Sequence, residues 1–233
     1  MNRYPEWYYN ELKQPGTDYS DMEEVRTYDE HMQKVRNITK ENEEIILEIK
    51  PDKSKSVLEI GSGTGEFAIE VSKYCKRVFA VDVSKAMLEY AGQKAEKRGR
   101  KNIEFFHGGF LTYEHQGEPI DIVVSQIVLH HLPDFWKMIA LRRVFNILKK
   151  GGIFYLRDVV FPSEDDYEPF FHTLLDNIGK VDRKLAGQTA IHIKEEYSTL
   201  DWIMEDLLKR AGFFIRKTHK PDGMTTAYLC IKK

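Results

Sequence analysis

The stretch VLEIGSGTGEFAIEV, residues Val57–Val71, decides how this chain folds. A short apolar run, typical of a buried strand, leads into a loop with glycines at positions 61, 63 and 65, and an amphipathic segment at helical spacing follows. Because glycine has no Cβ, the backbone of such a loop can turn tightly and come close to a bound molecule. The stretch therefore predicts a strand, a ligand-binding loop and a helix in succession.

An acidic residue, Asp82, ends the next apolar run, VFAVD, 17 residues after Gly65. At that position its carboxylate would lie beside the glycine loop and accept hydrogen bonds from both hydroxyls of a ribose. The structural alternative is a turn that only packs helix on strand, with Asp82 capping the helix that follows. Since strand, loop, helix, strand and acid occur in the order that a nucleoside site requires, we expect a nucleoside-type ligand here.

The spacing of the glycines separates two classes of nucleoside-binding enzyme. Dinucleotide-dependent oxidoreductases favour G-x-G-x-x-G, in which a helix N-terminus neutralises a pyrophosphate, whereas this loop reads G-x-G-x-G. Glu59 stands two residues before the first glycine. A carboxylate there suits a ligand with an ammonium group, such as S-adenosylmethionine, although Glu59 can equally serve only the amides of its own loop.

The rest of the chain divides one predicted domain, residues 1–233, into four parts. In the central part, short apolar runs alternate with amphipathic segments, which is the pattern of an α/β fold with a parallel sheet. The five strand candidates are VLEI, VFAV, IEFF, DIVVSQ and IFYLRDVV. The four parts are an N-terminal helical cover over 1–50, a cofactor-binding core over 51–160, a substrate-side insertion over 161–200, and a closing helix and hairpin over 201–233.

Helices and a turn are predicted towards both ends of the chain. One helical stretch is expected from about Met22 to Lys50. Another is expected around Thr199–Ala211, with Gly212 as its C-terminal cap. Two strands then flank the turn-forming Pro221-Asp222-Gly223, which predicts an antiparallel hairpin.

Composition narrows the set of partners. Lys and Arg number 35 against 37 Asp and Glu, and the formal net charge is -2, so no global field would gather nucleic acid or an anionic membrane. The basic run at 94–101 closes a helix, where cations are favourable. The first residues lack the apolar core of a signal peptide, and no apolar run is long enough to span a bilayer. With two distant cysteines and no Cys-x-x-Cys pair, we expect a cytoplasmic protein without membrane or nucleic-acid partners.

Four segments together resemble the class I S-adenosylmethionine-dependent methyltransferases, particularly the stand-alone small-molecule enzymes. EIGSGTG resembles their cofactor loop, AVDVSKAML their acidic second-strand motif, SQIVLHHLPD their fourth-strand segment, and LKKGGIFYLRD the strand after a Gly-Gly turn. The likeness covers about Ser56 to Phe161 and, through the hairpin, the C-terminus. It implies a Rossmann-like, seven-stranded, mostly parallel sheet with one antiparallel strand and helices on both faces.

The resemblance also implies S-adenosyl-L-methionine as the cofactor and assigns residues to its parts. One departure concerns adenine: many relatives have an Asp after the third strand that accepts from the adenine amino group, but FFHGGFL places Gly109 there. Backbone groups of Gly109 and Phe110 are expected to take over, with Phe110 covering the ring. By resemblance, Gly61, Ser62, Gly63, Thr64 and Gly65 contact the methionine and ribose portions, Asp82 the ribose hydroxyls, Val83 and Met87 one face of adenine, and Gln126 lies near the methionine end.

Methyl transfer from a sulfonium depends on positioning and desolvation, and a base is needed only when the acceptor must lose a proton. His130 and His131 follow the fourth strand at the cofactor end of the sheet and are the candidates for that base. The structural alternative is a strand-end pair in which one imidazole packs and the other is solvated. Asp134 and Asp158 have no adjacent carboxylate or amide, so we expect no catalytic metal.

Acceptor choice is expected to lie in the insertion and the N-terminal cover. The insertion leaves the fifth strand at the edge where open α/β folds bind ligands, and His172, His192 and Tyr197 offer polar groups there. A flap that only buries apolar side chains is the alternative. The N-terminal aromatics either close over the cofactor, with Tyr28 at the acceptor, or simply pack on the domain. They are Trp7, Tyr8, Tyr9, Tyr19 and Tyr28.

The sequence therefore predicts an S-adenosylmethionine-dependent methyltransferase acting on a small-molecule acceptor. Two alternatives stay open: an enzyme that modifies RNA or protein, and a cofactor-binding module without catalysis. Near-neutral charge and the absence of an appended basic domain favour a small acceptor over RNA, because phosphate binding normally needs clustered Lys and Arg.

Overall fold

The predicted strand, loop and helix around the glycines form as β1 (Ser56–Ile60), a tight loop and α3 (Glu66–Val71). Gly61, Gly63 and Gly65 adopt φ angles of 80°, 49° and 78°, in the left-handed region that favours glycine. A Cβ on Gly61 would lie 2.1 Å from the side chain of Val128. Gly61 is therefore required both for the backbone conformation and for the close approach of the Val128 segment.

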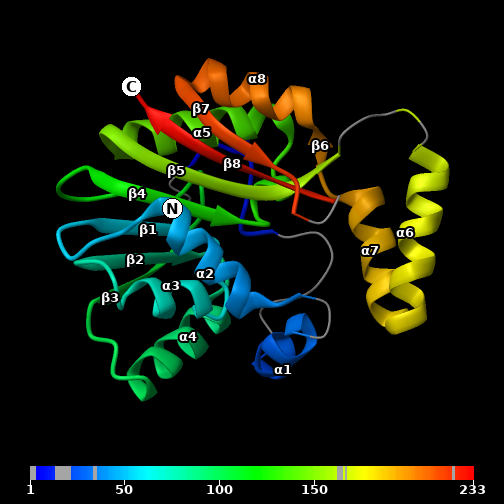
Figure 1. Cartoon of the computed structure of the whole chain (residues 1–233), viewed down its shortest axis with the longest axis horizontal. Helices are drawn as coiled ribbons and strands as arrows, with labels where there is room; N and C mark the ends of the chain where they lie inside the picture. The colour runs from blue at the N-terminus through cyan, green and yellow to red at the C-terminus, as the bar shows by residue number, and fades with distance from the viewer. Residues whose placement is uncertain (1–3, 14–21, 34–35, 162–164, 166, 222–223) are drawn as a thin grey trace.

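One mixed sheet runs through the residues that the computed structural model describes, which are 4–13, 22–33, 36–161, 165, 167–221 and 224–233. The strand order is β3-β2-β1-β4-β5-β8-β7, and the two-residue β6 pairs with β5 (Figure 1). Among these strands, β8 alone runs in the direction opposite to the others. The other strands are β2 (Arg77–Asp82), β3 (Ile103–His107), β4 (Ile120–Gln126), β5 (Leu148–Phe161), β6 (Thr199–Leu200), β7 (Phe213–His219) and β8 (Thr225–Lys232).

Helices cover both faces of the sheet, because successive strand residues point to opposite sides and both sides are apolar. On one face α5 (Asp134–Ile147) and α8 (Asp201–Ala211) pack in a core that includes Leu58. On the other face α2 (Ile38–Ile49) and α3 pack in a core that includes Val57, the preceding residue. Beside α3 lies α4 (Lys85–Lys97), whose Lys94 donates to Glu66 of α3 (Figure 1). The predicted fold class, including the antiparallel strand and the hairpin, is confirmed.

Two boundaries differ from the sequence prediction. The helical stretch expected from Met22 to Lys50 is two helices, α1 (Met22–Gln33) and α2, with a new N-terminus at Asn37, whose side chain accepts from the amide of Lys40. The helix expected around Thr199–Ala211 begins at Asp201, because Thr199 and Leu200 pair with β5 as β6. Its end is as predicted, with Gly212 left-handed at φ 108°.

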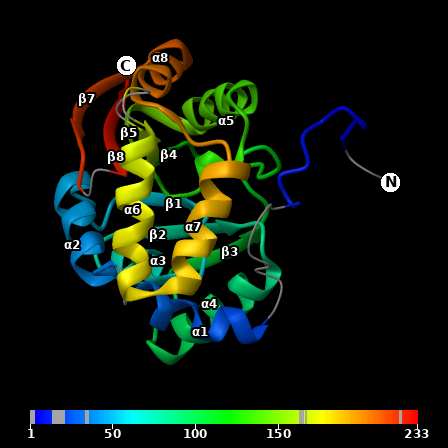
Figure 2. The ribbon, with the colours of Figure 1, turned by 90° about the vertical axis from the view of Figure 1, so that its right-hand side faces the viewer.

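The segment after β5 forms two helices, α6 (Tyr167–Val181) and α7 (Arg183–Glu195), joined at Asp182. They stand beyond the carboxyl ends of the parallel strands (Figures 1 and 2). No residue of either helix is fully buried among those described. The pair is thus a projection placed over the ligand-binding edge of the sheet.

Residues 4–13 form a non-helical segment, so the predicted N-terminal helical cover over 1–50 is helical only in part. Figure 2 shows this segment, in dark blue, on the side of α5. The hydroxyl of Tyr8 donates to the carbonyl of Leu111 at 3.2 Å, and that of Tyr9 to the carbonyl of His131 at 3.0 Å. Both rings pack against Trp136 of α5. Tyr19 lies outside the described residues.

Within the described part of the chain, none of the helices combines the length and the apolar character that crossing a bilayer requires.

Candidate functional site

A cavity of about 750 Å³, including its open mouth, lies at the carboxyl ends of β1, β2 and β4. Most of the residues assigned to the cofactor line it, together with Tyr28 and His131. The lining consists of Glu11, Tyr28, Ile60, Gly61, Gly63, Asp82, Val83, Met87, Gly108, Gly109, Phe110, Gln126, Ile127, Val128, His131 and Leu132.

Asp82 joins the glycine loop to the start of α4. Its carboxylate accepts from the amide of Gly63 at 2.7 Å and from the amide of Ser84 at 2.8 Å. Burial raises the pKa of this carboxyl, and the two amide donors oppose that rise. A carboxylate offers about four lone-pair positions, so acceptor capacity remains for a ligand in the cavity that Asp82 lines.

The remaining residues assigned to the loop stand behind the cavity wall rather than in it. Thr64 donates from its hydroxyl to Asp29 of α1 at 2.5 Å. A Cβ on Gly65 would lie 2.9 Å from the Cβ of Ala91, so this glycine lets α4 pack closely. The buried hydroxyl of Ser62 has no hydrogen-bond partner among the described residues. These three residues shape the loop and do not line its ligand side.

Glu59 is also behind the wall, with 3% of its surface exposed. Burial and the nearby charge of Asp82 raise its pKa well above the usual range, while the amide of Ala68 donates to the carboxylate and opposes this. One carboxylate oxygen has no hydrogen-bond partner among the described residues. Of the two roles left open by the sequence, the contacts favour service to the strand-to-helix turn.

The residues present fit a cofactor of the S-adenosylmethionine type. A Cβ on Gly63 would meet nothing within 4 Å, so the loop backbone is accessible from the cavity. Asp82 has acceptor positions that could serve the hydroxyls of a ribose, and Val83 and Met87 offer apolar surface to a flat ring. Gln126 lies at the end of β4, in the same cavity. The glycine loop, the carboxylate of Asp82 and the apolar surface of Val83 and Met87 therefore all line one cavity.

The carboxylate of Glu11 lies in the space that a side chain at position 109 would fill. A Cβ on Gly109 would lie 2.6 Å from Oε2 of Glu11. Sequence reasoning did not identify Glu11, because nothing local marks a residue so far along the chain from the third strand. The glycine at 109 was the one available signal, since it removes a side chain from the adenine end of the site.

The two histidines of the 3₁₀ turn Leu129–His131 have opposite environments. His130 is buried outside the cavity, and its Nδ1 lies 2.5 Å from Oδ1 of Asp158. His131 lines the cavity, and its Nδ1 has no hydrogen-bond partner among the described residues. In the structure, the ring of His130 is packed and that of His131 is more accessible, which is close to the structural alternative that the sequence left open for this pair.

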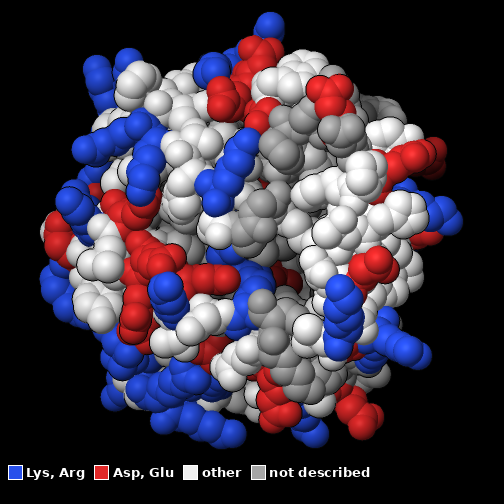
Figure 3. Space-filling model, turned by 45° about the vertical axis from the view of Figure 1, so that its right-hand side comes forward, with Lys and Arg blue, Asp and Glu red and all other residues white. Residues whose placement is uncertain are grey.

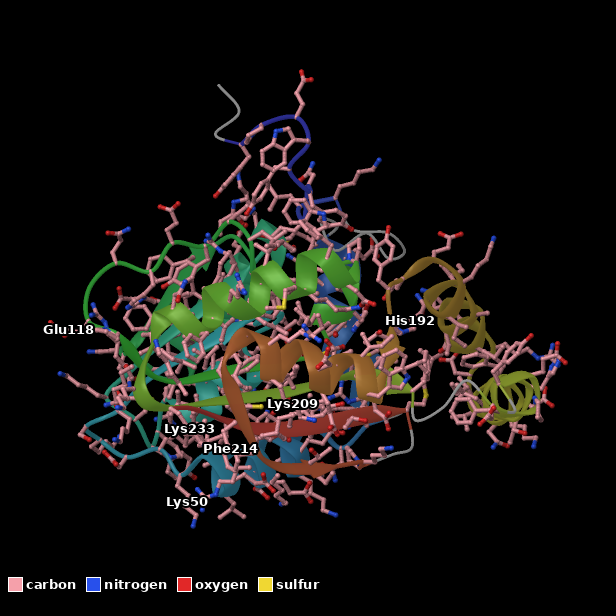
Figure 4. All side chains as sticks on the ribbon, turned by 90° about the horizontal axis from the view of Figure 1, so that it is seen from above. Lys50, Glu118, His192, Lys209, Phe214 and Lys233 are labelled. Carbon is pink, nitrogen blue, oxygen red and sulfur yellow. The ribbon has the colours of Figure 1, made fainter. Side chains whose placement is uncertain are left out.

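Glu196, just after α7, links these rings to the helical pair. Its Oε2 lies 3.1 Å from Nε2 of His130, 3.6 Å from Nδ1 of His131 and 2.6 Å from Nδ1 of His192. Figure 4 shows His192 on the side of α7 that faces the rest of the molecule. Ser198 lies 3.0 Å from the other ring nitrogen of His192. The histidine cluster (His130, His131, His192, Glu196 and Asp158) therefore spans β5, the turn after β4 and α7.

Charges within the histidine cluster shift the two rings in opposite directions. Burial disfavours the charged form of His130, but Asp158 and Glu196 outweigh burial and raise its pKa to about 9. Burial and the neighbouring positive His130 lower the pKa of His131 to about 4. Burial alone would raise the pKa of Asp158 and Glu196, but the charge of His130 and hydrogen bonds to it lower both. At neutral pH the cluster thus pairs a charged His130 with a neutral His131.

One subset of the histidine cluster has metal-ligand spacing. One ring nitrogen each from His130 and His192 and one oxygen of Glu196 lie within 4.8 Å of one another. A divalent ion can bind such a donor set only through ring nitrogens that carry no proton, so the charged form of His130 would have to give up a proton. The sequence did not predict this grouping, since the three residues come from a turn and from a helix more than 60 residues away.

The three remaining acceptor candidates lie in different places. Tyr28 of α1 lines the cavity, and burial raises the pKa of its phenol. Tyr197 is 41% exposed. Its amide donates to the carbonyl of His130 at 2.9 Å, its carbonyl accepts from Lys137, and its side chain is hydrogen-bonded with Tyr9. His172 of α6 is exposed and does not line the cavity. The structure brings Tyr28 to the cavity and His192 to the histidine cluster beside it, and leaves His172 apart.

Ile127 lines the cavity with a φ of 55°, a conformation rarely adopted by β-branched residues. Its amide donates to the carbonyl of Arg157 at 2.7 Å. Backbone strain of this kind costs about 1–3 kcal/mol and persists only where the surroundings hold it. The strand β5 thus holds the strained turn at the end of β4 against the cavity.

Comparison with known proteins agrees with this geometry. A family model described as a methyltransferase domain matches residues 57–152. An uncharacterized methyltransferase of Geobacillus sp. (strain WCH70) is 30% identical over 204 residues, covering 84% of this chain and 85% of that protein. Another, from Bacillus mycoides (strain KBAB4), is 26% identical over 209 residues, covering 87% and 93%.

Solved structures share the fold. An S-adenosylmethionine-dependent methyltransferase from Aquifex aeolicus superposes with a TM-score of 0.65 at 16% identity, covering 91% of this chain and 99% of that one. Magnesium protoporphyrin IX methyltransferase from Synechocystis PCC 6803, with bound S-adenosylhomocysteine, gives 0.61 at 17% identity, covering 83% of each. Fold and relatives agree: the chain belongs to the methyltransferase family and has the fold of the class I S-adenosylmethionine-dependent methyltransferases.

Proposed function

We propose that this chain binds S-adenosyl-L-methionine in the cavity described above and transfers its methyl group to a small molecule. The observation that carries the proposal is the joint lining of one cavity by Gly61, Gly63 and Asp82. Asp82 accepts from the ribose hydroxyls, Val83 and Met87 hold one face of adenine, and Gln126 orients the methionine end. Glu59, Ser62, Thr64 and Gly65 position the loop from behind.

His131 is the base in this proposal. The bound cofactor supplies an electrophilic methyl group, and the acceptor must release a proton if it is a hydroxyl, thiol or ammonium. His131 lines the cavity and is neutral near pH 7, so it can take that proton. Glu196, 3.6 Å from its Nδ1, stabilises the imidazolium that forms. His130 does not touch the cavity and acts as a positioning residue, held by Asp158.

We propose that the histidine cluster holds a proton rather than a metal ion. His130 lies between two buried carboxylates, those of Asp158 and Glu196, and a proton on its ring already balances one of these charges. A metal would have to displace that proton, whose removal is opposed by both carboxylates. Dialysis against a chelator is expected to leave turnover within twofold, and a loss that Zn²⁺ restores would overturn this assignment.

A small acceptor is favoured by the surface as well as by the cavity. Figure 3 shows the described Lys and Arg side chains of this face interspersed with Asp and Glu, and the formal net charge is -2. Binding to RNA normally uses clustered basic side chains that follow the phosphates. Glu11 of the N-terminal segment lines the cavity, and Glu196, just after α7, lies 3.6 Å from Nδ1 of His131 at its edge.

Two measurements test the function. Calorimetry should show micromolar binding of S-adenosylhomocysteine and no comparable binding of NAD. Labelled S-adenosylmethionine, incubated with a fractionated small-molecule extract, bulk RNA or protein, should give a labelled product in the small-molecule arm. Label in RNA or protein would reassign the acceptor class, and binding without any product would indicate a non-catalytic module.

A further inference from the structure

The N-terminal segment places a carboxylate at the adenine end of the cavity. Glu11 is 8% exposed although it lies outside any helix or strand. Both of its oxygens accept from the amide of Leu111 at 3.0 Å, and Oε1 also accepts from the hydroxyl of Thr112 at 2.6 Å. These bonds fix the carboxylate against the turn that follows β3, about 100 residues away in the sequence.

We propose that Glu11 is the acceptor for the exocyclic amino group of adenine and thereby replaces the Asp that this chain lacks at position 109. The inference rests on the proposed function, because it assumes an adenine-containing cofactor. Glu11 lines the cavity together with Gly109, Phe110, Val83 and Met87, the residues assigned to adenine. A carboxylate supplied by the N-terminal segment thus stands in the adenine subsite.

Because Gly109 has no side chain, it leaves the space in which this carboxylate lies. A Cβ there would lie 2.6 Å from Oε2 of Glu11 and 2.7 Å from its carboxyl carbon, distances that real Cβ atoms do not show. A side chain at 109 would therefore require the carboxylate of Glu11 to move from this position, and it would also lie 2.9 Å from Cγ1 of Val83. The glycine that removes an acceptor from the loop also makes the space in which another acceptor lies.

The hydrogen-bond inventory of Glu11 suits an amino group. Oε1 accepts from the Leu111 amide and the Thr112 hydroxyl, whereas Oε2 accepts only from the Leu111 amide, so Oε2 retains lone pairs. Oε2 is also the carboxylate oxygen nearest the space beside Gly109. An adenine amino group donates to such an oxygen. The oxygen that replaces it in hypoxanthine would face the carboxylate with like polarity and no proton, so the site should discriminate strongly between the two bases.

The surrounding contacts hold the segment in place without help from Glu11. Tyr8 and Tyr9 donate to the carbonyls of Leu111 and His131, and both rings pack on Trp136. Removing the carboxylate of Glu11 should therefore leave the segment docked. This makes a binding measurement on a Glu11 variant interpretable.

The test compares S-adenosylhomocysteine with its deaminated analogue, S-inosylhomocysteine, by calorimetry. The full-length protein should prefer the adenine compound by about 100-fold. Glu11→Ala should reduce this preference to less than about fivefold, mainly by weakening the adenine compound. Glu6→Gln is the matched control, since Glu6 is an exposed carboxylate of the same segment and should leave the preference unchanged.

A double variant tests the same assignment in the opposite direction, by placing an acceptor at position 109 once the carboxylate of Glu11 is removed. Adding Gly109→Asp to Glu11→Ala should restore part of the preference, because only the contact with Cγ1 of Val83, 2.9 Å from a Cβ at 109, then has to relax. Gly109→Asp alone also meets the carboxylate of Glu11 and should weaken binding more. An unchanged preference in Glu11→Ala, or a double variant no better than Glu11→Ala, overturns the assignment. Absence of S-adenosylhomocysteine binding by the unaltered protein would instead overturn the proposed function, and with it this inference.

Discussion

The two walls of the cavity are built in different ways. The wall made by β1, the glycine loop, β2 and α4 comes from 42 consecutive residues, 56–97, and its polar contacts are mostly backbone amides held by Asp82. The second wall, together with the residues behind it, is assembled from side chains that are far apart in the sequence: Glu11, which lines the cavity, bonds to Leu111, and Glu196, behind His131, lies against His130. The first wall can be recognised from a local motif, and the second only from the folded chain.

The largest effect is expected on the first wall, from Asp82→Ala. This change removes the acceptor for two ribose hydroxyls and the partner of the Gly63 and Ser84 amides. With about 1.5–3 kcal/mol for each charge-assisted hydrogen bond, affinity for S-adenosylhomocysteine should fall by about 1,000-fold. Calorimetry measures the loss, and Asp206→Asn, an exposed carboxylate on α8, serves as the control. A loss below threefold would remove Asp82 from the site.

Substitution of the cavity-lining histidine in the second wall is expected to lower kcat and to leave the affinity for the cofactor unchanged. His131→Ala removes the proposed base and is expected to lower kcat by about 100-fold, with cofactor affinity within threefold. His172→Ala on exposed α6 is the comparison, and its kcat should stay within twofold. Equal effects of the two changes would mean that neither ring acts on the acceptor. Because the pKa of His131 is lowered to about 4, kcat should be flat from about pH 6 to 8.

The histidine cluster gives the second wall a pH-dependent stability. The folded pKa of His130 is raised to about 9, above its unfolded value near 6.5, so its contribution is complete below pH 6.5 and is lost as the pH rises towards 9. The free energy of unfolding should fall over that window by an amount on the order of 1–3 kcal/mol. Glu196→Gln removes one of the two carboxylates and should flatten the slope. Denaturant titrations at several pH values measure it, and Glu195→Gln should match the unaltered protein.

The smallest effect is expected where α1 packs on the first wall. Asp29 accepts from Thr64 of the glycine loop at 2.5 Å and from Lys94 of α4 at 2.5 Å. Asp29→Asn weakens both contacts, so the dissociation rate of S-adenosylhomocysteine should rise about three- to tenfold, with a smaller change in the association rate. Stopped-flow fluorescence can follow both rates. A change confined to the association rate would show that α1 does not retain the ligand.

The contrast between the walls also explains what the sequence could predict. Glycine spacing, apolar periodicity and the acid after β2 are local signals, and they placed the strands, the loop and Asp82. Glu11 and Glu196 act across about 100 and 66 residues, and no periodicity records such a pairing. The break between α1 and α2 was missed because helical spacing continues on both sides of Asn37, and only its cap reveals the new N-terminus.

The left-handed Ile127 bears on protein engineering. A glycine at this position would adopt the same φ without strain, so a screen for thermal stability would favour Ile127→Gly. That variant would also lose a side chain from the cavity, and the backbone between β4 and the 3₁₀ turn Leu129–His131 would become more flexible. At Ile127, the substitution expected to raise the melting temperature is therefore also expected to lower the turnover rate. A library sorted only for melting temperature should accumulate slower enzymes, whereas one sorted for turnover should keep the isoleucine.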